Sequence, residues 1–198
     1  MRGLYPITPD MADTDALLRK VEAALKAGVA MLQYRNKAIS KDKRLLQAKE
    51  IAPLARGYGV PLIVNDDVEI ALAVGANGAH LGREDGDLGA ARARLGGKIL
   101  GVSCYDSLES ARAAVRAGAD YVAFGSVFPS PTKPDARRAS LSLFRHDLGV
   151  PLCAIGGITL ENAPSVIAAG ASLLAVITDV FDASDIGARA VQYRRLFS

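Results

Sequence analysis

The stretch from Ala117 to Phe124 reads AGADYVAF, and it joins an Ala- and Arg-rich segment to a short apolar run. Glycine just after a helix supplies the left-handed backbone conformation of a C-cap, so Gly118 indicates a helix end. The run that follows it is short, apolar and partly aromatic, which is typical of a buried strand. The stretch therefore predicts a helix that passes directly into a strand of a buried sheet.

The same junction recurs three more times along the chain. Glycines 28, 75 and 170 also stand at the ends of helix-like segments, and the four glycines are 47, 43 and 52 residues apart. Each interval corresponds to about two strand–helix units. Strands are expected at about residues 2–7, 29–34, 60–65, 78–81, 98–102, 119–124, 150–155 and 172–177. Helices are expected at about residues 14–27, 40–57, 67–74, 87–95, 107–117, 140–147, 160–169 and 184–197.

Eight alternating units predict a parallel sheet with helices outside it. Two architectures compete, a closed barrel and an open doubly wound sheet. An open sheet usually carries a Gly-rich dinucleotide turn after its first strand, but residues 6–10 read PITPD. Eight strands also suit closure, because their side chains fill a barrel interior. We therefore expect residues 1–198 to form a single compact (β/α)8 TIM barrel domain, with the active site at the C-terminal ends of the strands.

Composition narrows the class of protein further. The chain has 198 residues, 50% of them hydrophobic, which excludes a disordered chain. No apolar run approaches the length of a membrane span, and residues 1–6 lack a signal-peptide core, so we expect a cytoplasmic location and no membrane partner. The net charge of +3 is modest and no basic stripe with interleaved aromatic residues occurs, so no nucleic acid partner is expected. Cys104 and Cys153 adjoin apolar strands and are expected to be small buried residues.

Residues 125–134, which read GSVFPSPTKP, follow the strand at 119–124. Three prolines within six residues exclude both helix and strand beyond this point. The loop carries two hydroxyl groups, on Ser130 and Thr132, and one ammonium group, on Lys133. Such donors just past a strand end are suited to binding an anion. The alternative is a proline-rich connector with a solvated lysine.

Charged residues follow other strands at the same expected rim. Arg35 and Lys37 follow the second strand, and together with a lysine from the sixth they suit a ligand with several negative charges, such as a diphosphate. Asp66 and Asp85 follow adjacent strands and would repel each other unless a cation lay between them. Mg²⁺ is bound by one or two carboxylates together with substrate phosphates and waters, so the pair indicates a magnesium–diphosphate site. The alternative is a pair of helix N-caps, the role that we expect for Asp67.

A second anion site is expected beside the last two strands. Gly156 and Gly157, and then Ile177 and Thr178, bring backbone N–H groups to helix starts, where barrels often hold a phosphate monoester. The alternative is that the Gly-Gly pair serves only to permit close packing. A diphosphate with Mg²⁺ beside a monophosphate indicates a transfer reaction in which the diphosphate leaves. No Ser–His–Asp arrangement is evident, and we interpret both histidines as structural.

Six motifs resemble those of the thiamine phosphate synthase family, in the family's order and over essentially the whole chain. They are QYRNK at 33–37, VND at 64–66, HLGRED at 80–85, GVS at 101–103, GSVFPSPTK at 125–133 and AIGGI at 154–158. The resemblance implies a barrel transferase that joins 4-amino-2-methyl-5-hydroxymethylpyrimidine diphosphate to 4-methyl-5-(2-hydroxyethyl)thiazole phosphate. It implies the release of pyrophosphate, one Mg²⁺ ion per subunit, and a dissociative mechanism in which the diphosphate leaves first.

The resemblance also assigns roles residue by residue. It implies pyrimidine diphosphate contacts at Gln33, Tyr34, Arg35, Asn36, Lys37, Asn65, Ser103 and Lys133. It implies metal ligation by Asp66 and Asp85, and thiazole phosphate contacts at Ser130, Pro131, Thr132, Gly157, Ile177 and Thr178. Lys133, Arg35 and Ser103 are the expected catalytic residues. The chain departs from the family pattern at Asn36, where Glu is common, at Thr178, where Ser is frequent, and at Cys104-Tyr105, where a small residue and His are often found.

Three other functions fit parts of the pattern. A thiazole tautomerase paralogue would bind a thiazole phosphate on the same barrel without needing Asp66, Asp85 or Lys133. A non-catalytic binder of phosphate ligands would keep the monophosphate loops but not the carboxylate pair. A different phosphate-sugar barrel would explain the Gly-Gly loop but not residues 131–133. The expected partners are small phosphorylated substrates; the oligomeric state stays open, and a homo-oligomer is compatible with the sequence.

Overall fold

The computed structural model describes residues 1–83, 85–129 and 138–198 of the chain. Its centre is a single sheet of parallel strands in the order β1-β8-β7-β6-β5-β4-β3-β2. An isolated parallel bridge between Ile7 and Gln33 joins the two end strands, β1 and β2, and brings the sheet to closure. The strands are β1 (Gly3–Pro6), β2 (Leu32–Tyr34), β3 (Leu62–Asn65), β4 (Gly78–Leu81), β5 (Ile99–Tyr105), β6 (Tyr121–Phe124), β7 (Leu152–Ile155) and β8 (Leu173–Val176).

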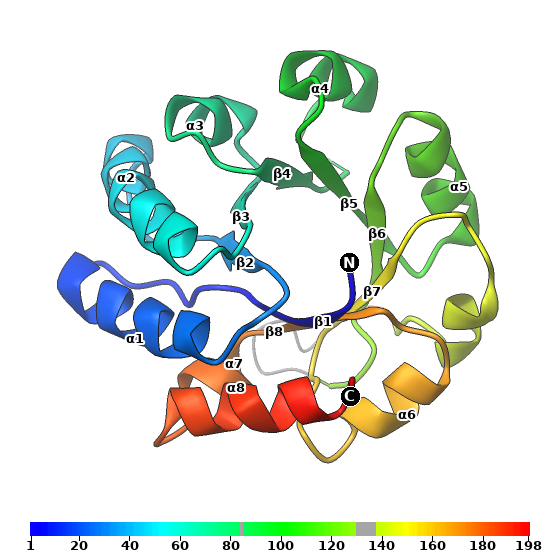
Figure 1. Cartoon of the computed structure of the whole chain (residues 1–198). Coiled ribbons are helices and arrows are strands. Elements are labelled where there is room, and N and C mark those ends of the chain that lie inside the picture. The colour runs from blue at the N-terminus through cyan, green and yellow to red at the C-terminus, as the bar shows by residue number, and fades with distance from the viewer. Residues whose placement is uncertain (84, 130–137) are drawn as a thin grey trace.

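Helices surround this sheet, and Figure 1 shows them as an outer ring around the strands. The predicted (β/α)8 barrel is therefore confirmed. The helices are α1 (Thr14–Lys26), α2 (Lys41–Gly57), α3 (Val68–Ala73), α4 (Leu88–Leu95), α5 (Leu108–Arg116), α6 (Ala163–Ala168), α7 (Thr178–Phe181) and α8 (Ile186–Arg195). No described helix is long and apolar enough to cross a membrane.

Local sequence signals set the limits of these elements. Six helices begin at an Asp or Ser whose side chain accepts the backbone N–H three residues later, which satisfies a donor that the helix leaves unpaired. The glycines of the four predicted junctions, at positions 28, 75, 118 and 170, all have positive φ, between 65° and 117°. That conformation ends a helix at little cost only when the residue lacks a Cβ. The repeating junctions therefore end the helices as predicted.

Two helical segments differ from the sequence prediction. The segment after β6 contains the 3₁₀ helix η1 (Leu141–Arg145) in place of an α-helix over 140–147. The short helix α7 precedes α8 and was not predicted. Its Asp179 carboxylate accepts hydrogen bonds from Arg189 Nη1 and from the Tyr193 hydroxyl, each at 2.7 Å, and both partners belong to α8. These contacts with α8 thus stabilise the four residues of α7, which local propensity alone would not keep helical.

The buried side chains form two apolar clusters. The larger one lies between the strands and the helices and consists mostly of Leu, Val and Ala. The smaller one fills the barrel interior and includes Tyr5, Ile63, Tyr121 and Leu173. Alternation along each strand separates the clusters, because successive side chains point to opposite faces of the sheet. Cys104 and Cys153 are buried free thiols, one in each cluster, as predicted.

The Tyr121 ring depends on a glycine in the neighbouring strand. A Cβ placed on Gly101 of β5 would overlap the Tyr121 ring and hydroxyl. We expect Gly101→Ala to lower the free energy of unfolding by about 3 kcal/mol, since the ring has no room to move in a packed interior. Gly97→Ala is the control, because that Cβ would meet nothing within 4 Å; it should change stability by less than about 0.5 kcal/mol. Urea unfolding measures both, and equal changes would contradict the packing argument.

Candidate active site

A cavity of about 920 Å³ opens at the C-terminal ends of the strands, where the sequence predicted the active site. Its volume is that of a typical pocket for small molecules. Residues from the ends of all eight strands line it, including Ile7, Arg35, Asn65, Gly82, Ser103, Gly125, Gly156 and Ile177. The cavity therefore collects polar groups from segments that are far apart in the sequence.

The second strand contributes alternate residues to this cavity. Gln33, Arg35 and Lys37 line it, whereas Tyr34 and Asn36 do not. The side chains of Tyr34 and Asn36, which were predicted as substrate contacts, reach Gln47 of α2 instead, on the helix side of the sheet. Period-two alternation along a strand was the signal that could have separated the two groups.

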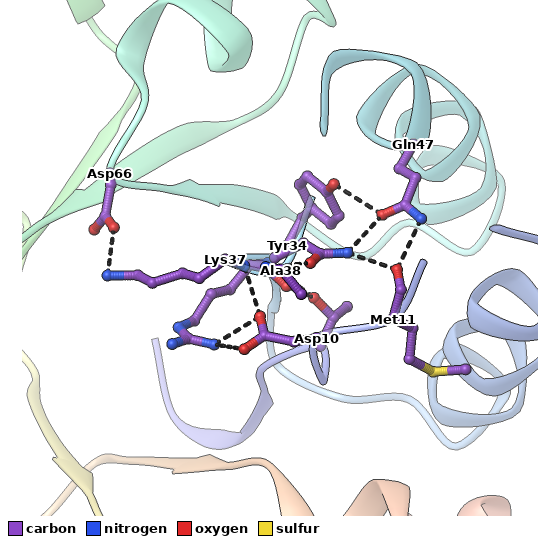
Figure 2. Close-up of polar contacts among 10 residues, drawn as sticks. Asp10, Met11, Tyr34, Lys37, Ala38, Gln47 and Asp66 are labelled. Atoms are coloured by element: carbon purple, nitrogen blue, oxygen red, sulfur yellow. Dashed lines mark hydrogen bonds and ion pairs between the residues drawn. The ribbon is translucent and has the colours of Figure 1, made fainter. Parts of the chain in front are cut away.

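Asn36 belongs instead to a buried amide network with Met11 and Gln47, two partners that Figure 2 labels. Its Nδ2 donates to the Met11 carbonyl at 2.6 Å and to Gln47 Oε1 at 3.0 Å, and its Oδ1 accepts from the Ala38 N–H at 3.1 Å. The Tyr34 hydroxyl also donates to Gln47 Oε1, at 3.0 Å. Because Gln47 lies in α2, the network fixes the loop after β2 to that helix. Asn36 thus holds its neighbours Arg35 and Lys37 in place.

This role predicts a stability effect for Asn36. Asn36→Ala removes three hydrogen bonds made by a buried side chain, so we expect the free energy of unfolding to fall by about 2 kcal/mol. A residue that only contacts substrate would show no such loss. Gln192→Ala removes an exposed amide from α8 and should change stability by less than about 0.5 kcal/mol. Chemical unfolding of both variants tests this, and equal stabilities would contradict the scaffold role.

Asp10 is a site residue that sequence reasoning missed. Its carboxylate accepts two hydrogen bonds from Arg35 Nη1, at 2.9 and 3.0 Å, and one from the Lys37 backbone N–H at 2.7 Å. Asp10 lies four residues after the end of β1, in the segment 6–10 that lacks a dinucleotide turn. An acidic residue after the first strand, opposite the cations of the second, was the available signal.

Asp66 and Asp85 meet at the ends of β3 and β4. Burial raises the pKa of Asp85, and the nearby Asp66 carboxyl raises it further, against the opposing effect of the Gly82 N–H. That N–H donates to Asp85 Oδ2 at 2.6 Å, and Lys37 Nζ lies 3.1 Å from Asp66 Oδ2. Asp66 also has a φ of 62°, a conformation uncommon for a residue with a Cβ. The sequence correctly predicted that these carboxyl groups converge.

Helix capping does not account for this pair. The N-cap residues of α3 and α4 are Asp67 and Asp87, whose side chains accept the N–H groups of Ile70 and Ala90. Asp67 therefore has the capping role that was predicted for it, and Asp66 and Asp85 remain available to a ligand. In the described part of the chain no three His, Cys, Asp or Glu side chains gather to hold a metal. Two carboxylates suit an ion that takes its other ligands from substrate phosphates and water.

A hydrogen-bonded row of side chains lies in the barrel at the floor of the cavity. The Tyr121 hydroxyl contacts both the Tyr5 hydroxyl, at 2.8 Å, and His80 Nδ1, at 2.9 Å. His80 Nε2 lies 2.8 Å from Ser103 Oγ. Burial lowers the pKa of His80 to about 4, although the Asp66 carboxylate acts in the opposite direction. His80 is therefore neutral, and it lies inside β4, which agrees with the structural role interpreted from the sequence. It also contacts Ser103, which is a predicted catalytic residue.

The far side of the cavity carries the predicted monophosphate loops. Gly156 and Gly157 have φ values of 100° and 61°, and Asn162 Nδ2 holds the Gly157 carbonyl at 2.9 Å. Ile177 and Thr178 line the cavity where β8 ends and α7 begins. The positive φ values require residues without a Cβ at this turn. The predicted residues Ser130, Pro131, Thr132 and Lys133 lie outside the described residues.

Two further cavity residues had no predicted role. The Arg83 guanidinium lies 5.0 Å from the centre of the Tyr105 ring, a cation–π distance, and both side chains line the cavity. The strand β5 runs on to Tyr105, three residues beyond its predicted end. Cys104 is consequently turned into the core, while Tyr105 faces the ligand space.

Comparison with known proteins agrees with this geometry. The family profile described as thiamine monophosphate synthase matches residues 4–180. The thiamine-phosphate synthase of Aromatoleum aromaticum is 63% identical over 100% of this chain and 97% of its own length. That of Methylobacillus flagellatus is 53% identical over 100% of this chain and 96% of its own length.

Solved structures give the same result. The thiamine phosphate pyrophosphorylase from Pyrococcus furiosus superposes with a TM-score of 0.86 at 34% identity, covering 98% of this chain and 95% of that one. A 3-hexulose-6-phosphate synthase superposes with a TM-score of 0.72 at 18% identity, with full coverage of both chains, and shares the fold alone.

Proposed function

The chain belongs to the thiamine monophosphate synthase family and is a transferase, and from this premise we propose the reaction that it catalyses. The enzyme joins 4-amino-2-methyl-5-hydroxymethylpyrimidine diphosphate to 4-methyl-5-(2-hydroxyethyl)thiazole phosphate, giving thiamine phosphate and pyrophosphate. The observation that carries this proposal is the convergence of Asp66 and Asp85 beside Lys37 in the main cavity. A binder of monophosphates alone has no use for such a pair.

The cations of β2 supply the electrostatics of the proposed reaction. Arg35 and Lys37 line the cavity on the same side as the carboxylate pair. They neutralise the negative charge that grows on the diphosphate as it leaves, and such preorganised charge is a large contribution to catalysis. The sequence adds Lys133 to this group. Gln33, Asn65 and Ser103 hold the pyrimidine so that its methylene carbon faces the thiazole side of the cavity.

The bond changes follow a dissociative order in this proposal. The bond between the methylene carbon and the diphosphate oxygen breaks first, and its electron pair leaves with pyrophosphate. The pyrimidine methylene cation is then captured by the lone pair of the thiazole nitrogen, which forms the new carbon–nitrogen bond. The backbone at Gly157, Ile177 and Thr178, with the loop residues Ser130, Pro131 and Thr132, holds the thiazole phosphate for this attack.

Asp66 and Asp85 would hold one Mg²⁺ ion per subunit. Bound there, the ion supplies further charge neutralisation to the leaving diphosphate. The raised pKa of Asp85 fits this role, because a carboxylate placed beside another carboxylate is stabilised by a cation between them.

Pyrophosphate release from the two phosphorylated substrates, with and without Mg²⁺, tests the proposal. We expect release only when both substrates and the metal are present. Binding of the thiazole phosphate without any pyrophosphate release would refute it and would favour a tautomerase or a non-catalytic binder. Isothermal titration of each substrate separates these outcomes.

A further inference from the structure

One continuous chain of hydrogen bonds crosses the barrel at the floor of the cavity. Gln33 Nε2 donates to the Tyr5 hydroxyl at 2.8 Å, and that hydroxyl lies 2.8 Å from the Tyr121 hydroxyl. His80 continues the chain from Tyr121 to Ser103 Oγ, at 2.9 and 2.8 Å. We call these five residues the polar chain. Its two ends, Gln33 and Ser103, come from β2 and β5, and every member except Tyr121 lines the cavity.

The donor at one end fixes the direction of every bond in the polar chain. An amide nitrogen can only donate, so the Tyr5 oxygen accepts from Gln33, and the Tyr121 hydroxyl is the one acceptor that the described residues offer to the Tyr5 proton. Tyr121 then gives its own proton to His80 Nδ1. A neutral imidazole carries one N–H, which must therefore be on Nε2 and must point to Ser103 Oγ. The Ser103 hydroxyl hydrogen is left to point into the cavity.

The opposite direction satisfies fewer groups. If Tyr121 donated to Tyr5, the Tyr5 oxygen would accept twice and its own proton would have no hydrogen-bond acceptor among the described residues. Tyr5 borders the cavity but is only 1% exposed, and Tyr121 is fully buried, so solvent has little access to either hydroxyl group. Buried polar groups in proteins are rarely left without a partner. The first direction therefore accounts for all the hydrogen atoms, and the second does not.

We propose that Tyr5, Tyr121 and His80 are positioning residues that hold His80 as the Nε2–H tautomer and present the Ser103 hydroxyl to the ligand as a donor. The ligand group facing Ser103 is then a hydrogen-bond acceptor of the pyrimidine substrate. That identity rests on the proposed function, whereas the tautomer does not. An analogue with a donor at the same place is rejected, because two donors would face each other.

The packing around the polar chain keeps the arrangement rigid. The Tyr5 and Tyr121 rings meet edge to face with centroids 5.8 Å apart, and the His80 ring stacks on Tyr121 at 5.5 Å. The glycine at position 101 leaves the space that the Tyr121 ring fills. A ring held by several neighbours loses little further freedom when it accepts or donates a hydrogen bond, so the direction set at Gln33 can persist as far as Ser103.

The tautomer of His80 can be observed directly by nitrogen NMR. The chain has two histidines, so a His146→Gln background labelled with ¹⁵N-histidine shows His80 alone. We expect a single Nε2–H tautomer in the ligand-free protein. An Nδ1–H tautomer there would overturn the proposal. Because no substrate is present, this result does not depend on the reaction that the enzyme catalyses.

A sharper test reverses the direction of the hydrogen bonds in the polar chain, starting from Gln33. Gln33→Glu replaces a donor by a carboxylate that only accepts, so Tyr5 should turn towards it and His80 should switch to Nδ1–H. The spectrum is recorded at about pH 9.5, where even a buried carboxyl group is ionised. Tyr34→Phe, which removes a hydroxyl group from the opposite face of β2, is the control and should not produce the switch. A His80 tautomer that stays Nε2–H in Gln33→Glu would overturn the proposal.

A double-mutant cycle tests whether Tyr121 acts through Ser103. Tyr121→Phe should lower kcat/KM for pyrophosphate release about tenfold, the typical effect of one lost hydrogen bond. In a Ser103→Ala background the same change should have almost no further effect, because the hydroxyl that it positions is gone. An equal loss in both backgrounds would overturn the positioning role. If no pyrophosphate is released by the parent protein, the proposed function fails while the tautomer measurements still decide this inference.

Discussion

An Asp85→Asn variant is expected to lose pyrophosphate release at least about 100-fold while remaining as stable as its parent, or becoming more stable. The loss follows from the proposed role, because an amide cannot supply the negative charge that a divalent cation needs at this position. The stability follows from the position of Asp85, whose carboxylate is partly desolvated and lies beside Asp66. A change that abolishes activity without destabilising the fold is characteristic of a residue retained for function.

The sign of the stability effect can be derived from the pKa. The folded-state pKa of Asp85 is raised above its unfolded value, so the folded protein holds the proton more tightly. Stability is then lost as pH rises from the unfolded pKa through the folded pKa. At neutral pH the ionised group destabilises the fold, and asparagine removes that effect. Urea unfolding should therefore favour the variant at pH 7 and show no advantage in acid, where the parent carboxyl is protonated.

Asp87→Asn is the matched control for this experiment. Asp87 lies two residues away and caps α4 through a 2.7 Å hydrogen bond from the Ala90 N–H. Asparagine is an equally good N-cap, so neither activity nor stability should change by much. Normal activity in Asp85→Asn would show that the carboxylate pair has no special part in the reaction. A loss of activity that only accompanies a loss of stability would show the same.

Gly157→Ala is expected to lower kcat/KM for the thiazole phosphate about 100-fold, mainly through a higher KM. Gly157 has a φ of 61°, and a Cβ there would overlap the Pro129 carbonyl and lie 2.9 Å from Phe128 atoms. The backbone of the turn after β7 must therefore shift away from the loop after β6. Because the proposed phosphate contacts are backbone N–H groups of this turn, a shift of about 1 Å weakens them together.

Gly149→Ala is the control that separates the effect of the steric clash at Gly157 from the effect of backbone strain. Gly149 has a similar φ of 72°, but a Cβ there would meet nothing within 4 Å. Both variants lose about 1 kcal/mol from the left-handed conformation, and only Gly157→Ala should also change substrate kinetics. Initial-rate measurements over a range of thiazole phosphate concentrations distinguish the two. Equal KM values for both variants would show that the turn after β7 does not hold the phosphate.

The sequence predicted the fold well because its signals are local and repeated. Each junction glycine and each Asp or Ser N-cap acts within one turn of its own position, so neither requires knowledge of distant contacts. Helix α7 was missed for the opposite reason, since its Asp179 is held by residues of α8. The extension of β5 to Tyr105 likewise depends on pairing with Phe124 across a register shift.

The site was predicted less completely, and strand geometry explains the difference. Every polar residue of QYRNK was assigned to the substrate, although alternation sends Tyr34 and Asn36 to the opposite face of the sheet. The polar chain was missed because its members come from five strands, and only the closed barrel brings the Tyr5 and Tyr121 hydroxyl groups together. Charged residues at strand ends could be predicted, but the direction of a hydrogen bond could not.

The ion pairs at the mouth of the cavity have a consequence for competing solutes. Arg35 is paired with Asp10, and Lys37 with Asp66, so the charge of each cation is already partly balanced before an anion arrives. A singly or doubly charged buffer ion such as sulfate or orthophosphate therefore gains little there, whereas a diphosphate bound with a divalent ion satisfies the cations and the carboxylates together. The enzyme should therefore tolerate common inorganic anions at concentrations far above those of its substrates. Selectivity of this kind comes from ionic partners that the protein already carries, and it costs no additional residues.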